Sequence, residues 1–392
     1  MTKNTQSPYF FWKKYPISRK IQLKWIFRVI LVGLLAQMML SGQLWWKSEG
    51  VLPYLPLFFT EGAWLEKSSI VLFPAFLLLV LINFCLPQKK IFLKFLLLSG
   101  VLLILGNIHR FQVWFYFYGL ILFLYLWKQY TSAEVLIATL RGVVAGVYSW
   151  SGLHKFNNYF VEDIFPWLIE PLEFLFHSLP SECAYGAGGV ELLIGIGLLL
   201  SPTRNISVVC SIIFHIIILG LLGPFGHNWN PVVWPWNLVM PLLVFLLFFE
   251  KEKLTLNNRV FTLRSFPAGL LVLGIVWILP AFNYLGFTPE QLSFKMYAGS
   301  QPEIVLYYGE KDRGLMKEHP TIHGALPSET SPRYRVVLDD IAFVEWGTPL
   351  FTTPTTARKI AQQFCQKMQR PEEGGLLYLV ADEFVQIPCQ AE

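Results

Sequence analysis

Four polar or ionisable side chains stand within, or at the ends of, apolar stretches in the middle of this 392-residue sequence. They are Lys155, Glu191, His215 and Asn237. Charge inside hydrocarbon costs several kcal/mol, so such residues usually face a protein interior or a wet cavity. We therefore predict that helices bring the four together in one polar pocket. The chemistry of this set is proton transfer, with Lys155, Glu191 and His215 as the groups that handle the proton.

Three further residues are predicted to belong to the same pocket. His154 directly precedes Lys155 and joins the predicted catalytic group. Tyr148 lies about two turns before it in the same apolar run, and Trp236 directly precedes Asn237. We predict that Tyr148, Trp236 and Asn237 bind a small molecule.

Each of these residues also has a purely structural interpretation. Lys155 at a helix end would extend to a headgroup region. Glu191 would hydrogen-bond across a surface of small residues, because several glycines surround it. His215 would be a satisfied packing histidine. The tryptophans near Asn237 would form an interfacial belt: Trp229, Trp234 and Trp236.

The elements that must position these residues follow from composition. Hydrophobic residues make up 54% of the chain and charged residues only 15%, against about 25% charged in soluble domains. The apolar residues are gathered into nine runs of near-bilayer length, which predicts an all-α polytopic membrane bundle. The runs are 25–40, 68–86, 91–107, 112–127, 134–153, 187–201, 205–222, 235–249 and 266–284.

Loop charge predicts the orientation of this bundle. The basic residues gather in the first 24 residues and in alternate loops, among them Lys89, Lys90 and Lys128. By the positive-inside rule those loops are cytoplasmic. We expect a bacterial inner-membrane protein with a cytoplasmic N-terminal segment (1–24), a transmembrane region (25–285) and a periplasmic domain (286–392).

The segment 162–179 is apolar but contains two prolines and four acids. These residues argue against a membrane span and favour an interfacial or re-entrant element. It would act either as a lid on the pocket or as a surface helix that rests among headgroups.

The region after Gly286 reads as a small α+β domain. Strands are predicted within 293–299, 302–310, 333–347 and 374–382, and a helix over 355–370. Disulfides persist in an oxidising compartment, so we predict that its two cysteines, Cys365 and Cys389, are paired.

Other sites find little support in the sequence. Pro320 separates His319 from His323 and spoils a helical pair of metal ligands, so no metal site is predicted. No nucleotide-binding or nucleophile-elbow motif is present in a suitable context. The net charge of +5 follows membrane topology, so no nucleic-acid partner is predicted.

The stretches SGLHKF and GGVELLIGIGLLLSPTRN resemble the DoxX-like membrane family over about 145–222. The longer plan resembles the HTTM family, which is related to the vitamin K-dependent γ-carboxylases. That resemblance implies that Lys155 acts as a base toward a quinone or hydroquinone, with His154 in the position before it. Asn157 departs from the family's Asp, and the tail is too short for the region that binds the carboxylation substrate, so carboxylation itself is not implied.

Two functions remain open from the sequence. The first is an inner-membrane enzyme that acts on a quinone or another lipophilic substrate and uses Lys155, Glu191 and His215. The second is a non-enzymatic transporter or assembly factor whose exported domain binds a periplasmic protein.

Overall fold

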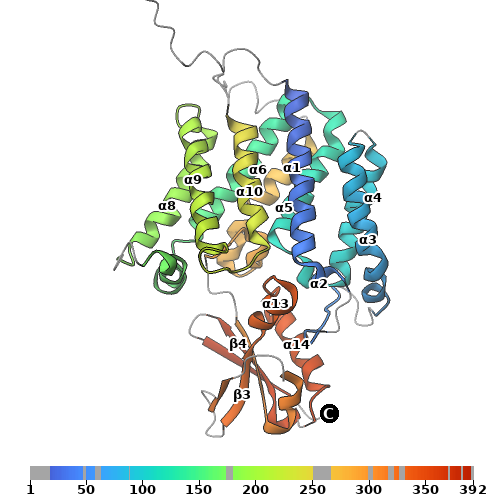
Figure 1. Ribbon diagram of the computed structural model, residues 1–392, viewed down its shortest axis with the longest axis vertical. Coiled ribbons are helices and arrows are strands. Elements are labelled where there is room, and N and C mark those ends of the chain that lie inside the picture. The colour runs from blue at the N-terminus through green and yellow to red at the C-terminus, as the bar shows by residue number, and fades with distance from the viewer. Residues whose placement is uncertain are drawn as a thin grey trace, which may run out of the picture.

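The protein is a bundle of helices with a small domain containing a β-sheet at one end (Figure 1). A computed structural model describes residues 18–46, 50–57, 63–87, 89–173, 180–249, 266–298, 303–316, 322–325, 332–369, 371–380 and 383–389. The predicted combination of a helical region and an α+β domain is therefore confirmed at this level.

The bundle is built from the apolar runs of the sequence. Its main helices are α1 (Arg19–Leu40), α3 (Ala63–Cys85), α4 (Lys90–Gly106), α5 (Val113–Trp127), α6 (Ala133–Leu153), α8 (Cys183–Leu199), α9 (Arg204–Leu222), α10 (Val233–Phe248) and α12 (Pro267–Trp277). Shorter elements connect them: α2 (Gly42–Trp45), η2 (Ile108–Arg110), η3 (Lys128–Tyr130), η4 (Phe160–Ile164), α7 (Phe165–Ile169), η5 (Glu170–Leu172), η6 (Leu279–Leu285) and η7 (Glu290–Ser293). Side chains cap two of the main helices, because Ser18 accepts from the Ile21 amide and Ser132 from the Val135 amide.

Each of the nine apolar runs is helical, but their lengths differ. Five helical segments of the described chain are long and apolar enough to cross a membrane: Arg19–Leu40, Lys67–Cys85, Ala133–Leu153, Arg204–Leu222 and Pro267–Leu285. The others are shorter, with 17 residues in α4 and α8, 16 in α10 and 15 in α5. Nine spans are therefore not confirmed.

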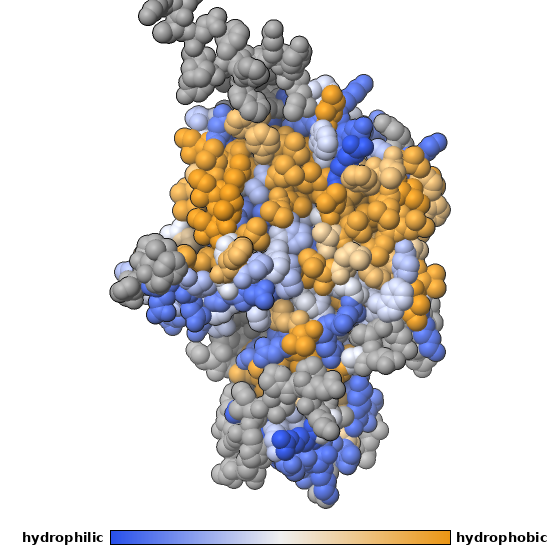
Figure 2. Space-filling model, in the orientation of Figure 1, coloured by the Kyte–Doolittle hydropathy of each residue, from blue (hydrophilic) through white to orange (hydrophobic). Residues whose placement is uncertain are grey.

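The outer surface of the bundle is apolar over a broad band (Figure 2). Val71 on α3, Leu193 on α8 and Ile206 on α9 are each at least 66% exposed. A large contiguous apolar surface marks contact with another apolar phase or with a partner. The surface is therefore compatible with a lipid environment.

The described part of the C-terminal domain contains an antiparallel sheet of five strands. The strands are β1 (Glu303–Tyr308), β2 (Ile322–Ala325), β3 (Pro332–Val337), β4 (Gly375–Val380) and β5 (Glu383–Pro388), in the order β2-β3-β1-β4-β5. Helices α13 (Leu338–Trp346) and α14 (Pro354–Cys365) and the 3₁₀ turns η8 (Glu310–Met316) and η9 (Pro371–Glu373) complete it. The predicted strands at 302–310 and 374–382 and the predicted helix are confirmed.

One strand prediction is correct only in its first part, and another is wrong. The predicted strand 333–347 ends at Val337, and the rest forms α13, whose buried residues Leu338, Ile341, Ala342 and Trp346 follow a helical spacing. Within the predicted strand 293–299, Ser293 ends η7 and residues 294–298 are irregular, because Phe294 and Tyr297 adopt left-handed backbone angles. Its carbonyl groups bond side chains of the bundle instead of a neighbouring strand. Strands β2 and β5 were not predicted.

The predicted disulfide between Cys365 and Cys389 is confirmed. It joins the end of α14 to the residue after β5, across a sequence separation of 24. A crosslink of this kind restricts the unfolded chain and so stabilises the domain.

The domain docks on the bundle through hydrogen bonds between its backbone and side chains of the bundle. The Phe351 amide donates to His109 Nδ1 at 3.0 Å, and Gln112 Nε2 donates to the Pro349 carbonyl at 3.1 Å. The rings of His109 and Trp346 lie 5.2 Å apart. Burial lowers the pKa of His109 to about 3, so this histidine is neutral and its Nδ1 accepts the bond.

Candidate functional site

A cavity of about 510 Å³ lies between the bundle and the docked domain. Its bundle side is formed by residues of α1, α5, α6, α8, α9 and α10, and its roof by η7, the segment after it, and α13. Most of its wall is apolar or aromatic, including Trp114, Phe214, Ile218, Trp236 and Phe343. Cavities of this size and lining hold drug-sized ligands.

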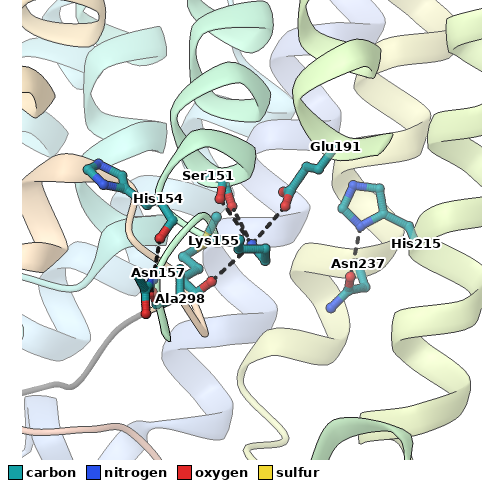
Figure 3. Close-up of polar contacts among 9 residues, drawn as sticks. Ser151, His154, Lys155, Asn157, Glu191, His215, Asn237 and Ala298 are labelled. Atoms are coloured by element: carbon teal, nitrogen blue, oxygen red, sulfur yellow. Dashed lines mark hydrogen bonds and ion pairs between the residues drawn. The ribbon is translucent and has the colours of Figure 1, made fainter. Parts of the chain in front are cut away.

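Lys155 and Glu191 form a buried ion pair in the cavity wall. Lys155 Nζ lies 2.7 Å from Glu191 Oε2, and the two residues are only 7% and 6% exposed. Nζ also donates to the carbonyl and Oγ of Ser151, both at 3.1 Å, and to the Met296 carbonyl at 3.2 Å. The ammonium group is therefore held by acceptors on three parts of the chain (Figure 3).

Close packing of α6 on α8 brings this pair together. A Cβ atom on Gly152 would lie 2.3 Å from the Leu192 amide nitrogen, and one on Gly195 would lie 2.7 Å from the Ser149 amide nitrogen. Only glycine permits this approach of two backbones. Lys155 stands three residues after Gly152, and Glu191 directly precedes Leu192. The glycine-rich surface around Glu191 thus serves both packing and the site.

His215 forms a second polar group, connected to Tyr148 and Asn237. Its Nδ1 lies 2.8 Å from Asn237 Oδ1, and its Nε2 lies 2.6 Å from the Tyr148 hydroxyl. Asn237 Nδ2 donates to the Val233 carbonyl, so Oδ1 is the acceptor that faces the imidazole. A neutral His215 therefore carries its proton on Nδ1 and accepts from Tyr148 at Nε2.

The structure brings together most of the residues predicted from the sequence. Lys155, Glu191, His215, Trp236 and Asn237 all line the cavity. Tyr148 lies behind His215 and contacts it through its hydroxyl, which also pairs with Ser211 Oγ at 2.8 Å. Ser211 was not predicted, although it stands one turn before His215 on the same face of α9.

His154 does not line the cavity. Its ring lies 5.0 Å from that of Tyr284 and 5.6 Å from that of Trp150, on the opposite side of Lys155 from His215 (Figure 3). Burial and the nearby lysines Lys295 and Lys155 lower its pKa to about 4. Successive residues of a helix point about 100° apart, so the neighbour of a pocket residue usually faces elsewhere. His154 does not line the cavity, so its position gives no support to the predicted catalytic role.

The roof of the cavity is acidic. Glu290 pairs with Lys295 at 2.6 Å, and Glu303, Asp339 and Asp340 also line the cavity. Burial raises the pKa of Asp339 to about 7, and the nearby carboxylates add to the shift. Burial also raises the pKa of Glu290, Glu303 and Asp340. These acids lie in the predicted domain and were not predicted as part of the site.

The predicted interfacial segment is described as far as Glu173, and residues 174–179 fall outside the described chain. Ile164, Trp167 and Leu168 line the cavity. The Trp167 ring stacks on His227 at 4.4 Å, and its carbonyl lies 2.7 Å from His227 Nε2. The segment is thus fixed to the loop after α9.

The described residues contain no group of three or more His, Cys, Asp or Glu side chains that could hold a metal ion. His323 lies in β2, opposite Tyr334, and His319 lies outside the described residues. In comparisons with known proteins, no family model, no curated protein and no solved structure matches this chain.

Proposed function

We propose that the protein is a multi-pass membrane protein whose cavity binds a lipophilic molecule of the quinone or hydroquinone class and exchanges protons with it. The observation that carries this proposal is the ion pair of Lys155 and Glu191 in the wall of an aromatic-lined cavity. A flat ring suits the aromatic wall, and an oxygen on that ring suits the ammonium group.

The chemistry is a proton transfer through the pair. Lys155 passes one proton to Glu191, which leaves a neutral amine beside a neutral carboxyl group. The amine then accepts the hydroxyl proton of a hydroquinone and leaves its anion in the cavity. The second polar group, His215 with Tyr148, borders the same cavity, and its Nε2 already accepts from the Tyr148 hydroxyl, so the proton of the ligand goes to Lys155. General bases of this kind work when they lie within hydrogen-bond reach of the substrate.

The arrangement of the ends of the bundle supports the proposed topology. The domain contacts α2 and η2 at one end, and α1 begins at the other (Figure 1). The basic residues Lys20, Lys24, Lys90 and Lys128 belong to the end away from the domain. By the positive-inside rule this distribution supports a cytoplasmic basic end with the domain on the opposite side, and we propose the inner membrane of a bacterium as the location.

Mass spectrometry of small molecules retained by the gently solubilised protein tests this function. We expect a quinone or a related lipophilic compound in the wild type and its loss in Lys155→Ala. Retention of the same compound by both proteins would contradict the role of Lys155. If the wild type retains no such compound and also binds none when it is added, the non-enzymatic alternative is favoured.

A further inference from the structure

A buried glutamine on α1 has unused hydrogen-bonding capacity in the cavity wall. Gln37 is 0% exposed and lines the cavity, yet neither its Nε2 nor its Oε1 has a partner among the described residues. A buried amide without partners costs free energy that proteins usually avoid. Gln22, about four turns before Gln37 on the same helix, shows the usual outcome, because its Nε2 donates to the Leu246 carbonyl at 2.6 Å.

A second donor that is unpartnered in the described chain, Trp114 Nε1, belongs to a residue that lines the same cavity as Gln37. A Cβ atom on Gly33 would lie 2.7 Å from both Tyr118 Oη and Val239 Cγ2, which fixes the register of α1 against α5 and α10. Gln37 stands one helical turn beyond Gly33, and Trp114 stands one turn before Tyr118, so this register brings the two to the same level of the bundle, where both line the cavity. Trp114 is 5% exposed, and its Nε1 has no partner among the described residues.

The domain supplies the remaining member of this group. A Cβ atom on Gly347 would lie 3.4 Å from the Leu40 carbonyl, one turn beyond Gln37 on α1. The next residue, Thr348, lines the cavity, is 1% exposed and has an Oγ1 without a partner in the described chain. We call Gln37, Trp114 and Thr348 the α1 corner.

The α1 corner and the Lys155 pair occupy different sides of the cavity. Lys155 and Glu191 stand at the end of α6 and on α8, whereas Gln37 and Trp114 stand on α1 and α5, which Figure 1 shows within the same bundle. The α1 corner carries no charge, and its Gln37 Nε2 and Trp114 Nε1 are both hydrogen-bond donors. Two such donors fit an uncharged oxygen acceptor, such as a carbonyl group.

We propose that the α1 corner is a second binding subsite, which takes an uncharged oxygen of a ligand whose other oxygen lies at Lys155. The inference deepens the proposed function and rests on it. It identifies the ligand class as a flat apolar body with oxygen functions at two ends. Gln37 binds the ligand and takes no part in the proton transfer.

Titration calorimetry of the full-length protein in mild detergent tests the subsite with two probes. 1,4-Naphthoquinone has oxygens at both ends of one ring, and 1-tetralone has one. We expect the wild type to bind the quinone more tightly than the ketone. Gln37→Leu should weaken quinone binding about tenfold, the effect of losing one hydrogen bond to a ligand, and change ketone binding less than twofold. Trp114→Phe, which removes a single donor, should act in the same direction.

Gln22→Leu is the matched control on the same helix. It removes a satisfied hydrogen bond, so it should lower the denaturation temperature and leave both affinities unchanged. Gln37→Leu should retain or raise that temperature, because it removes an unsatisfied amide. If Gln37→Leu binds the quinone like the wild type, or loses both probes equally, the subsite is excluded. If the wild type binds neither probe, the proposed function and the subsite are excluded together.

Discussion

At the scale of single residues, the contacts of Lys155 show why Glu191 is needed beside it. Four acceptor atoms surround Nζ, which has three protons to donate. This surplus of acceptors stabilises the charged amine in the resting state. A base that is charged at rest needs a partner to take its proton first, and Glu191 is the group in direct contact. In the proposed function the ion pair therefore acts as one unit.

This coupling predicts a stability effect for Lys155→Met. The substitution leaves Glu191 as a buried carboxylate without its partner, which should cost about 3–5 kcal/mol of unfolding free energy. The double variant Lys155→Met/Glu191→Leu removes both charges and should recover most of that loss. Denaturation in mild detergent measures both variants. Equal stability of the single variant and the wild type would show that the pair is not formed.

The residue types of the pocket could be read from the sequence because charge in an apolar run is rare. Lys155, Glu191 and His215 were found in this way, and the structure places all three at one cavity. Gln37 and Ser211 escaped, since an uncharged polar residue in an apolar helix is a weak signal. His154 was included because it adjoins Lys155 in sequence, and helix geometry turns it away.

At the scale of elements, the contact between α6 and α8 decides the geometry of the site. Gly152, Gly188 and Gly195 let the two backbones approach so closely that no Cβ atom fits. Gly186 lies on the same helix as the last two, but a Cβ atom there would meet nothing within 4 Å. The glycines of α8 therefore differ in function although they look alike in sequence.

Gly152→Ala and Gly186→Ala form a matched pair that tests this contact. The new methyl group at 152 would meet the Leu192 backbone and push the helices apart, with an expected loss of about 3 kcal/mol. The separation should also weaken ligand retention, because it moves Lys155 from Glu191. Gly186→Ala should be neutral or stabilising by up to about 1 kcal/mol, since alanine favours a helix. Similar denaturation temperatures for the two variants would contradict the close packing.

Elements were predicted well where length and hydrophobicity alone define them. All nine apolar runs are helices, because a long apolar segment has few other ways to satisfy its backbone. The tail was harder. The stretch LDDIAFVEW alternates enough to resemble a strand, and its helical spacing becomes clear only where α13 packs against α2 and β1. Residues 294–298 lack a regular structure, and the bundle binds the carbonyl groups of Met296 and Ala298.

At the scale of the whole molecule, the cavity exists only because the domain docks on the bundle. Glu303, Asp339, Phe343 and Thr348 come from the domain, and Lys155 and His215 come from the bundle. The docking depends on single contacts such as that of Phe351 with His109, for which the sequence has no periodic signal. The sequence therefore predicted the residues that the bundle contributes to the cavity and missed those that the domain contributes.

The raised pKa of Asp339 in the acidic roof predicts that the stability of the protein depends on pH. Its pKa rises from an ordinary value of 3.8 to about 7 in the folded protein. Between these pH values the folded state binds a proton that the unfolded state has lost, so the contribution of Asp339 to stability is lost as the pH rises toward 7. Glu290, Glu303 and Asp340 face the same region and shift in the same direction, and Lys295 opposes the shift at Glu290.

Asp339→Asn isolates this contribution. The amide is neutral at every pH, and its Oδ1 can still accept the Leu350 amide, which Asp339 Oδ1 accepts at 2.8 Å. Denaturation temperatures at pH 5 and pH 8 should therefore differ less in the variant than in the wild type, and the variant should be the more stable protein at pH 8. His109 and His154 have lowered pKa values and destabilise the fold below about pH 6.5, but they do so equally in both proteins. Parallel pH profiles would mean that Asp339 is solvated and that the domain does not close the cavity as described.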